Sequence, residues 1–346
     1  MARERGGEEA QAPVTAGGAA GGSPGLLRSV PLLGGPGGSE SLTTVLVAFG
    51  ANVVIAVAKS AAAALTGSAS LVAEAAHSWA DAGNEIFLLI ANRRAGRPPD
   101  QAHPFGHGRE AYVWSLFAAL GLFVAGAAVS VTYGVLELAH PEPASYFAVG
   151  YAVLAVSFVF EGISFRQSAR QARAEASAMR RDLIEHVLAT SDPTLRAVFA
   201  EDSAALAGLV IAGIGLGAHQ ATGSVVPDAV GSILVGVLLA VVAVVLINRN
   251  RRSLVGEEAD PRVRAAALQA LLDAPEVARV TYLRLEVVGP RMVLLVGAVD
   301  LTGDDTESAL AVRLRALEER ISASPAVAGA VLTLSAPDDP ALAPGA

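Results

Sequence analysis

The chain has 346 residues, of which 53% are hydrophobic and 17% charged, and its mean hydropathy is +0.49. This composition is too apolar for an ordinary soluble domain of this length, and it predicts a membrane protein whose partner is the lipid bilayer. The formal net charge of −8 argues against a nucleic-acid partner, which would favour a basic surface. Cysteine is absent, which excludes disulfides and thiolate metal sites.

Residues 1–40 are dominated by Gly, Ala, Ser, Pro and Glu. Such a segment cannot bury enough apolar area to offset the entropy of ordering, so we expect a disordered N-terminal tail. The tail lacks the basic stretch, apolar core and cleavage site of a signal peptide. We therefore expect the first membrane-spanning helix to direct the protein to the membrane.

Six apolar segments follow, each of roughly 20 residues or slightly more, the length that crosses the hydrocarbon layer. They cover residues 43–66, 69–93, 111–136, 146–166, 196–218 and 225–248. The expected transmembrane domain is an all-α six-helix bundle over residues 41–252. Its second segment is the weakest by hydropathy because it carries several polar side chains, as expected for a helix sheltered inside the bundle.

Arginine is concentrated after the second, fourth and sixth segments, whereas the other three connections contain neither Lys nor Arg. By the positive-inside rule, both termini are predicted to be cytoplasmic. The acidic composition and the preference for arginine over lysine suggest a prokaryotic plasma membrane, and we expect the bacterial inner membrane.

After the sixth segment the pattern changes to that of a small soluble domain. Helical spacing over 261–273 is followed by two strand-like runs, 281–287 and 292–301, then by an amphipathic helix over 307–322 and a third strand over 326–334. This order predicts a cytoplasmic α+β domain of ferredoxin-like type over residues 253–336. The last residues, 337–346, are expected to fray.

The second segment carries a polar stripe. Its members Glu74, His77, Asp81 and Asn84 follow one another at steps of three, four and three, which places them on one face of a helix. Ionisable groups in hydrocarbon are costly unless paired, hydrated or bound to a cation, so His77 and Asp81 are candidate ligands of one divalent ion. A nitrogen-plus-oxygen set favours zinc or another first-row metal over magnesium or calcium. The alternative is that the stripe only forms hydrogen bonds between helices.

The fifth segment supplies the neighbouring acids Glu201 and Asp202 as further candidate ligands. They lie about 100° apart around a helix, so we expect only one of them to face the metal. Outside this site, Lys59 is expected to pair with Glu74, with a proton relay as the alternative. Asp228 is expected to cap the start of the sixth helix, and Glu161 to reach the headgroups at the inner face.

Three stretches of the sequence resemble motifs of a known family, the cation diffusion facilitators. Within that family they are most similar to the subgroup that contains zinc transporter 9. They are HSWAD beginning at His77, HPFGHGREAYVWSL over 103–116, and EDSAALAGL over 201–209. The resemblance covers about residues 50–335. It implies a proton-coupled exporter of zinc or a related divalent metal that works by alternating access, without a resident cofactor. It also implies a homodimer, formed through the soluble domain.

The resemblance further implies ligand pairs four residues apart on the second and fifth helices. His77 and Asp81 match the first pair, and Asp202 matches one member of the second, but the other position holds Val198, which cannot bind metal. Glu201 or water would then be the fourth ligand. Relatives can also bind a second metal in the loop between the second and third helices, where Asp100, His103 and His107 lie. The alternative for this loop is a tight Gly-rich turn with histidine caps.

Three other functions are weighed against export of zinc. The same mechanism would serve an exporter of manganese, cobalt or iron, and a membrane scaffold would use the polar stripe only for packing. An intramembrane metallohydrolase is disfavoured, because the chain contains no HExxH motif on a helix. The protein is therefore expected to be a secondary active transporter and not an enzyme.

Overall fold

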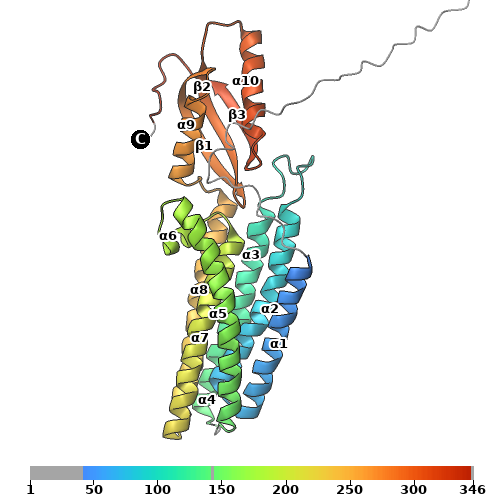
Figure 1. Cartoon of the computed structure of the whole chain (residues 1–346), viewed down its shortest axis with the longest axis vertical. Helices are drawn as coiled ribbons and strands as arrows, with labels where there is room; N and C mark the ends of the chain where they lie inside the picture. The colour runs from blue at the N-terminus through green and yellow to red at the C-terminus, as the bar shows by residue number, and fades with distance from the viewer. Residues whose placement is uncertain (1–41, 142–143, 344–346) are drawn as a thin grey trace, which may run out of the picture.

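The computed structural model describes residues 42–141 and 144–343, with side chains from residue 49 onward. The predicted disordered tail, residues 1–40, lies outside the described residues, as do residues 344–346 of the predicted frayed end. A long helical bundle forms one part of the molecule and a small α+β domain sits on one of its ends (Figure 1).

The bundle contains the six predicted spans. They are α1 (Leu42–Thr66), α2 (Ala69–Ala95), a third span that runs through α3 (Glu110–Gly121), the π-helical η1 (Leu122–Ala128) and α4 (Val129–Ala139), then α5 (Phe147–Ala178), α7 (Pro193–Thr222) and α8 (Val226–Val255). All except α2 are long and apolar enough to cross a membrane, and α2 falls short because of its polar stripe. The predicted six-helix transmembrane bundle is confirmed, and the protein is an integral membrane protein.

The segment between the fourth and fifth spans is more structured than the sequence predicts. Helix α5 continues about three turns beyond the expected end at residue 166, and a short helix, α6 (Leu183–Ala189), follows it. An apolar cluster made by α5, α6 and α7 explains both features; its buried members are Ala169, Ala172, Val187, Leu195 and Phe199. Burial of this cluster stabilises α6, whose seven residues would form only a marginally stable helix in isolation.

The C-terminal domain has the predicted helix–strand–strand–helix–strand order. It consists of α9 (Pro261–Leu272), β1 (Val277–Gly289), β2 (Met292–Leu301), α10 (Glu307–Ser322) and β3 (Val327–Leu334). The sheet order is β1-β2-β3, with β1 antiparallel and β3 parallel to β2. Because parallel neighbours need a crossover, α10 connects β2 to β3 and packs on the sheet. The α+β prediction is confirmed, and β1 starts four residues earlier than expected.

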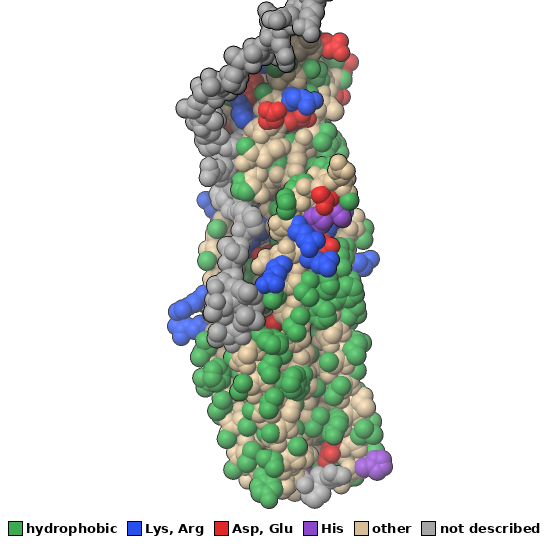
Figure 2. Space-filling model, turned by 90° about the vertical axis from the view of Figure 1, so that its right-hand side faces the viewer, with side chains coloured by type: hydrophobic (Ala, Val, Ile, Leu, Met, Phe, Trp, Pro, Cys, Tyr) green, Lys and Arg blue, Asp and Glu red, His purple; other side chains and the backbone are tan. Residues whose placement is uncertain are grey.

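The connections on one end of the bundle hold the C-terminal domain. The loop after α2 approaches the tip of the β1–β2 hairpin so closely that a Cβ on Gly108 would lie 2.7 Å from the Val288 carbonyl oxygen. Arg109 pairs with Glu286 of β1. Arg291, in the hairpin turn, donates to Glu175 of α5 at 2.6 Å. Figure 2 shows Lys and Arg side chains gathered between the apolar bundle and this domain.

Candidate functional site

Helix α2 carries the polar stripe through the middle of the bundle. It begins with Ser68 as N-cap, whose side chain accepts a hydrogen bond from the backbone N–H of Leu71. Glu74, His77 and Asn84 are buried, as are most of the alanines between them. The small side chains let neighbouring helices approach α2 closely, and the stripe therefore lies against protein.

His77 and Asp81 lie on the same face, as their spacing predicts. The His77 Nδ1 and Asp81 Oδ1 atoms are 3.5 Å apart, and the exposed fractions of the two side chains are 1% and 18%. Among the described residues, neither ring nitrogen of His77 has a hydrogen-bond partner, and neither does Asp81 Oδ1. Two potential ligand groups are therefore side by side and without hydrogen bonds at these atoms.

The two acids of α7 turn toward different helices. Asp202 accepts hydrogen bonds from Ser164 at 3.0 Å and from Ser168 at 2.8 Å, both on α5. Glu201 instead accepts one from the side-chain amide of Asn84 on α2. The two acids thus face different helices, as their separation of about 100° around α7 predicts. Asp202 is held by donors on α5, and Glu201 by a donor on α2.

The four candidate ligands do not form a closed set. Across the described ranges, the only group of three ligand side chains with their donor atoms within 4.8 Å of one another lies in the loop after α2. Asp81 nevertheless interacts electrostatically with both Asp202 and Glu201. A common ion would require Asp202 or Glu201 to turn an oxygen atom toward the α2 pair, and Val198 offers no ligand in their place.

The closed set is the loop cluster of Asp100, His103 and His107. Asp100 Oδ1 lies 3.2 Å from His103 Nδ1, and Asp100 Oδ2 lies 3.0 Å from His107 Nε2. The two imidazole rings are 4.0 Å apart between centroids. The hydrogen bond from His107, followed by that from the His103 backbone, lowers the pKa of Asp100 to about 2. One carboxylate thus holds two imidazoles in a cluster whose donor types suit a first-row divalent metal.

Three other ionisable residues of the bundle have predicted roles outside this site. Lys59 Nζ lies 3.0 Å from Glu74 Oε2 with both side chains fully buried, which confirms the predicted ion pair. Asp228 lies in the first turn of α8, but its carboxylate also accepts hydrogen bonds from the Ala69 backbone N–H and the Ser68 hydroxyl. Its carboxylate adds negative charge to the first turn of α8, as predicted, but the helix that it caps by hydrogen bonds is α2, a role that its own local sequence does not reveal. Glu161 is only partly buried on α5.

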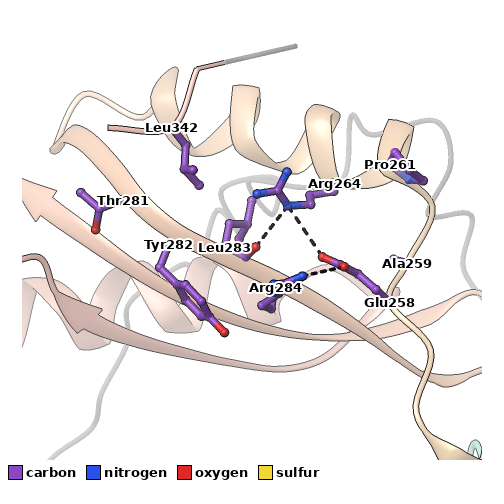
Figure 3. Close-up of a pocket in the computed structure, with 9 residues that line it drawn as sticks. All are labelled: Glu258, Ala259, Pro261, Arg264, Thr281, Tyr282, Leu283, Arg284 and Leu342. Carbon is purple, nitrogen blue, oxygen red and sulfur yellow. Dashed lines mark hydrogen bonds and ion pairs between the residues drawn. The ribbon is translucent and has the colours of Figure 1, made fainter. Parts of the chain in front are cut away.

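A pocket of about 570 Å³ lies in the C-terminal domain, along the outer edge of β1 (Figure 3). Arg264 and Arg284 point toward Glu258, and their distances to its carboxylate oxygens are 3.8 and 2.7 Å. The carboxylate offsets part of the positive charge, and the pocket lies outside the bundle that carries the polar stripe.

Comparison with known proteins gives a consistent result. Residues 45–255 match the model of the cation efflux transmembrane domain. Metal tolerance protein C4 of Arabidopsis thaliana is 34% identical over 233 residues, which are 67% of this chain and 51% of that protein. The mitochondrial proton-coupled zinc antiporter SLC30A9 of Homo sapiens is 32% identical over 238 residues, or 69% and 42% of the two chains.

A more distant relative is the manganese efflux system protein MneP of Bacillus subtilis. It is 23% identical over 245 residues, which are 70% of this chain and 78% of that protein. The chain spans about half or less of the length of the plant and human relatives.

Proposed function

This chain belongs to the cation efflux family, and on that basis we propose that it exports a divalent metal cation, with zinc as the first candidate, in exchange for protons. The observation that carries the proposal is the pair His77 and Asp81 on α2: His77 is buried, Asp81 is mostly so, and both have ligand atoms without a hydrogen-bond partner among the described residues, in electrostatic reach of the acids on α7. The ion is the transported substrate. The relatives whose names specify metal tolerance or zinc antiport support the same function.

The proposed ligands are His77, Asp81 and Asp202, with Glu201 as the candidate fourth. Neutral imidazole and ionised carboxylates bind a metal ion, whereas their protonated forms do not. Protons arriving from the outer side would therefore displace the ion and return inward as the counter-ion. Binding of the metal and release of protons are then one linked equilibrium, and alternating access carries it across the membrane.

The second part of the proposal concerns the loop cluster of Asp100, His103 and His107. Its three donor atoms lie within 4.8 Å of one another, which supports a second cation site where the loop contacts the C-terminal domain. An Asp100→Asn variant should weaken one of two binding steps in a calorimetric titration with zinc. A titration that is unchanged would leave the cluster as a hydrogen-bonded turn.

Orientation and assembly complete the proposal. The arginines lie at the bundle end that carries the C-terminal domain, which supports cytoplasmic termini in a bacterial inner membrane. The family resemblance supports a homodimer assembled through the C-terminal domain.

The decisive test is transport in vesicles. Purified protein reconstituted in liposomes should take up zinc when a pH gradient is imposed, and Asp81→Ala and Asp202→Ala should each abolish the uptake. Asp338→Ala, a change of the same type at an exposed site after the last strand, is the control. Uptake that survives both substitutions in the bundle would overturn the assignment, and a scaffold would take up no metal in any variant.

Manganese is the second candidate substrate. The relative named as a manganese efflux protein supports this candidate, and Val198 removes one ligand position on which a preference for zinc would depend. Calorimetric titration with Zn, Mn, Co and Cd ranks the candidates. If Mn binds more tightly than Zn, manganese becomes the proposed substrate, and the proposed transport mechanism is unchanged.

A further inference from the structure

Helix α5 reaches into the candidate site through two serines. Ser164 and Ser168 are one turn apart, so their hydroxyls lie on one face of α5, which packs beside α7 (Figure 1). Ser164 donates to Asp202 Oδ1 and Ser168 to Asp202 Oδ2. Each oxygen of this carboxylate is thus held by a hydroxyl from the same neighbouring helix.

The hydrogen bond from Ser168 to Asp202 can be exchanged for another one. The buried Ser168 hydroxyl also lies 3.1 Å from the backbone carbonyl oxygen of Phe165, a second acceptor on its own helix. A hydroxyl has one proton to donate, and a helical serine readily gives it to a carbonyl in the preceding turn. Ser168 can therefore release Asp202 without losing its hydrogen bond, and Ser164 can keep the other carboxylate oxygen in place.

We propose that Ser164 and Ser168 are positioning residues for transport, which orient the Asp202 carboxylate so that one oxygen can turn to the cation while the other stays held. This inference rests on the proposed function and adds α5 to the elements that build the site. Carboxylates that bind metal are usually oriented by such hydrogen bonds, and loss of the orienting partner typically weakens affinity or activity by about 10–100-fold.

The test separates positioning from packing by measuring both affinity and turnover. In zinc-uptake assays, the Ser164→Ala/Ser168→Ala variant should raise KM by about 10–100-fold and leave kcat within about threefold, because the ligand remains but is no longer oriented. Calorimetry with zinc chloride should show the same loss of affinity. The matching threonine variant retains both hydroxyls and should restore KM to within about threefold. Ser157→Ala, two turns nearer the start of α5 at another buried serine, is the control.

The outcomes divide clearly. An unchanged KM in the double alanine variant would overturn the inference, and so would a lower KM, since it would mean that the serines compete with the cation. A raised KM that the threonine variant fails to bring back down would show a packing effect and would also overturn the inference. If Asp202→Ala itself transports normally, Asp202 is not a ligand and the inference about the serines fails with it; the proposed function fails only if Asp81→Ala transports normally as well. If only Asp202→Ala is defective, the function stands and the role of the serines falls.

Discussion

Replacement of Lys59 by methionine should destabilise the bundle strongly. The ammonium group is fully buried and its one ion-pair partner is Glu74, whose other carboxylate oxygen has no hydrogen-bond partner among the described residues. Without Lys59, neither oxygen of that carboxylate is held. Leaving one member of such a pair alone costs about 3–5 kcal/mol, whereas apolar replacement of both members is often neutral or stabilising.

The measurement is unfolding in mixed micelles during a titration with SDS. The Lys59→Met variant should lose about 3–5 kcal/mol relative to the unmodified chain, and Lys59→Met/Glu74→Leu should recover most of that loss. The double variant is the control, because it removes the same lysine without stranding a charge. If Lys59→Met unfolds at the same SDS fraction as the unmodified chain, or if the double variant is the less stable, the ion pair does not support the bundle as argued.

Three further outcomes follow from close contacts and from the loop cluster. Gly208→Ala should destabilise the bundle in the same SDS titration, because the new Cβ would lie 2.5 Å from the buried carboxylate that pairs with Lys59. Gly108→Ala should loosen the C-terminal domain and speed hydrogen exchange in the β1–β2 hairpin, whereas Gly121→Ala, with no atom within 4 Å of the added Cβ, should not. The Asp100 carboxyl should titrate near pH 2 in its 13C shift, so its ionised contacts persist above its unfolded pKa of about 3.9 and are lost as the pH falls through 2. Titration near 3.9 would contradict the bond to His107.

Much of the fold could be predicted because its signals are local. Every span except α2 is marked by its own length and hydropathy, and the hairpin of the C-terminal domain by alternation around Gly289 and Pro290. Helix α6 could not be predicted, because seven residues carry too little periodicity and their stability comes from the apolar cluster with α5 and α7. The extension of α5 is hidden for a related reason, since the apolar pattern of this helix ends where its arginines begin, whereas the helix itself continues to Ala178.

The candidate site was only partly predictable. Spacing along α2 correctly placed His77 and Asp81 on one face, because the helical period decides it. Spacing could not decide which of Glu201 and Asp202 faces α2, since the rotation of α7 is set by packing between helices. The capping of α2 by Asp228 cannot be predicted either, because its partners are about 160 positions away in the chain.

The distribution of unpartnered polar atoms favours a functional site over a packing motif. Among the described residues, seven of the thirteen buried side-chain atoms without hydrogen-bond partners belong to α2; they are on Glu74, His77 (two atoms), Ser78, Asp81, Asn84 and Glu85. Each such atom costs about 1–3 kcal/mol, and a helix used only for packing would gain nothing by keeping them. The acids around α2 have donors, as the serines of α5 show for Asp202. Unsatisfied polar atoms thus concentrate on the helix that carries His77 and Asp81, two of the proposed ligands.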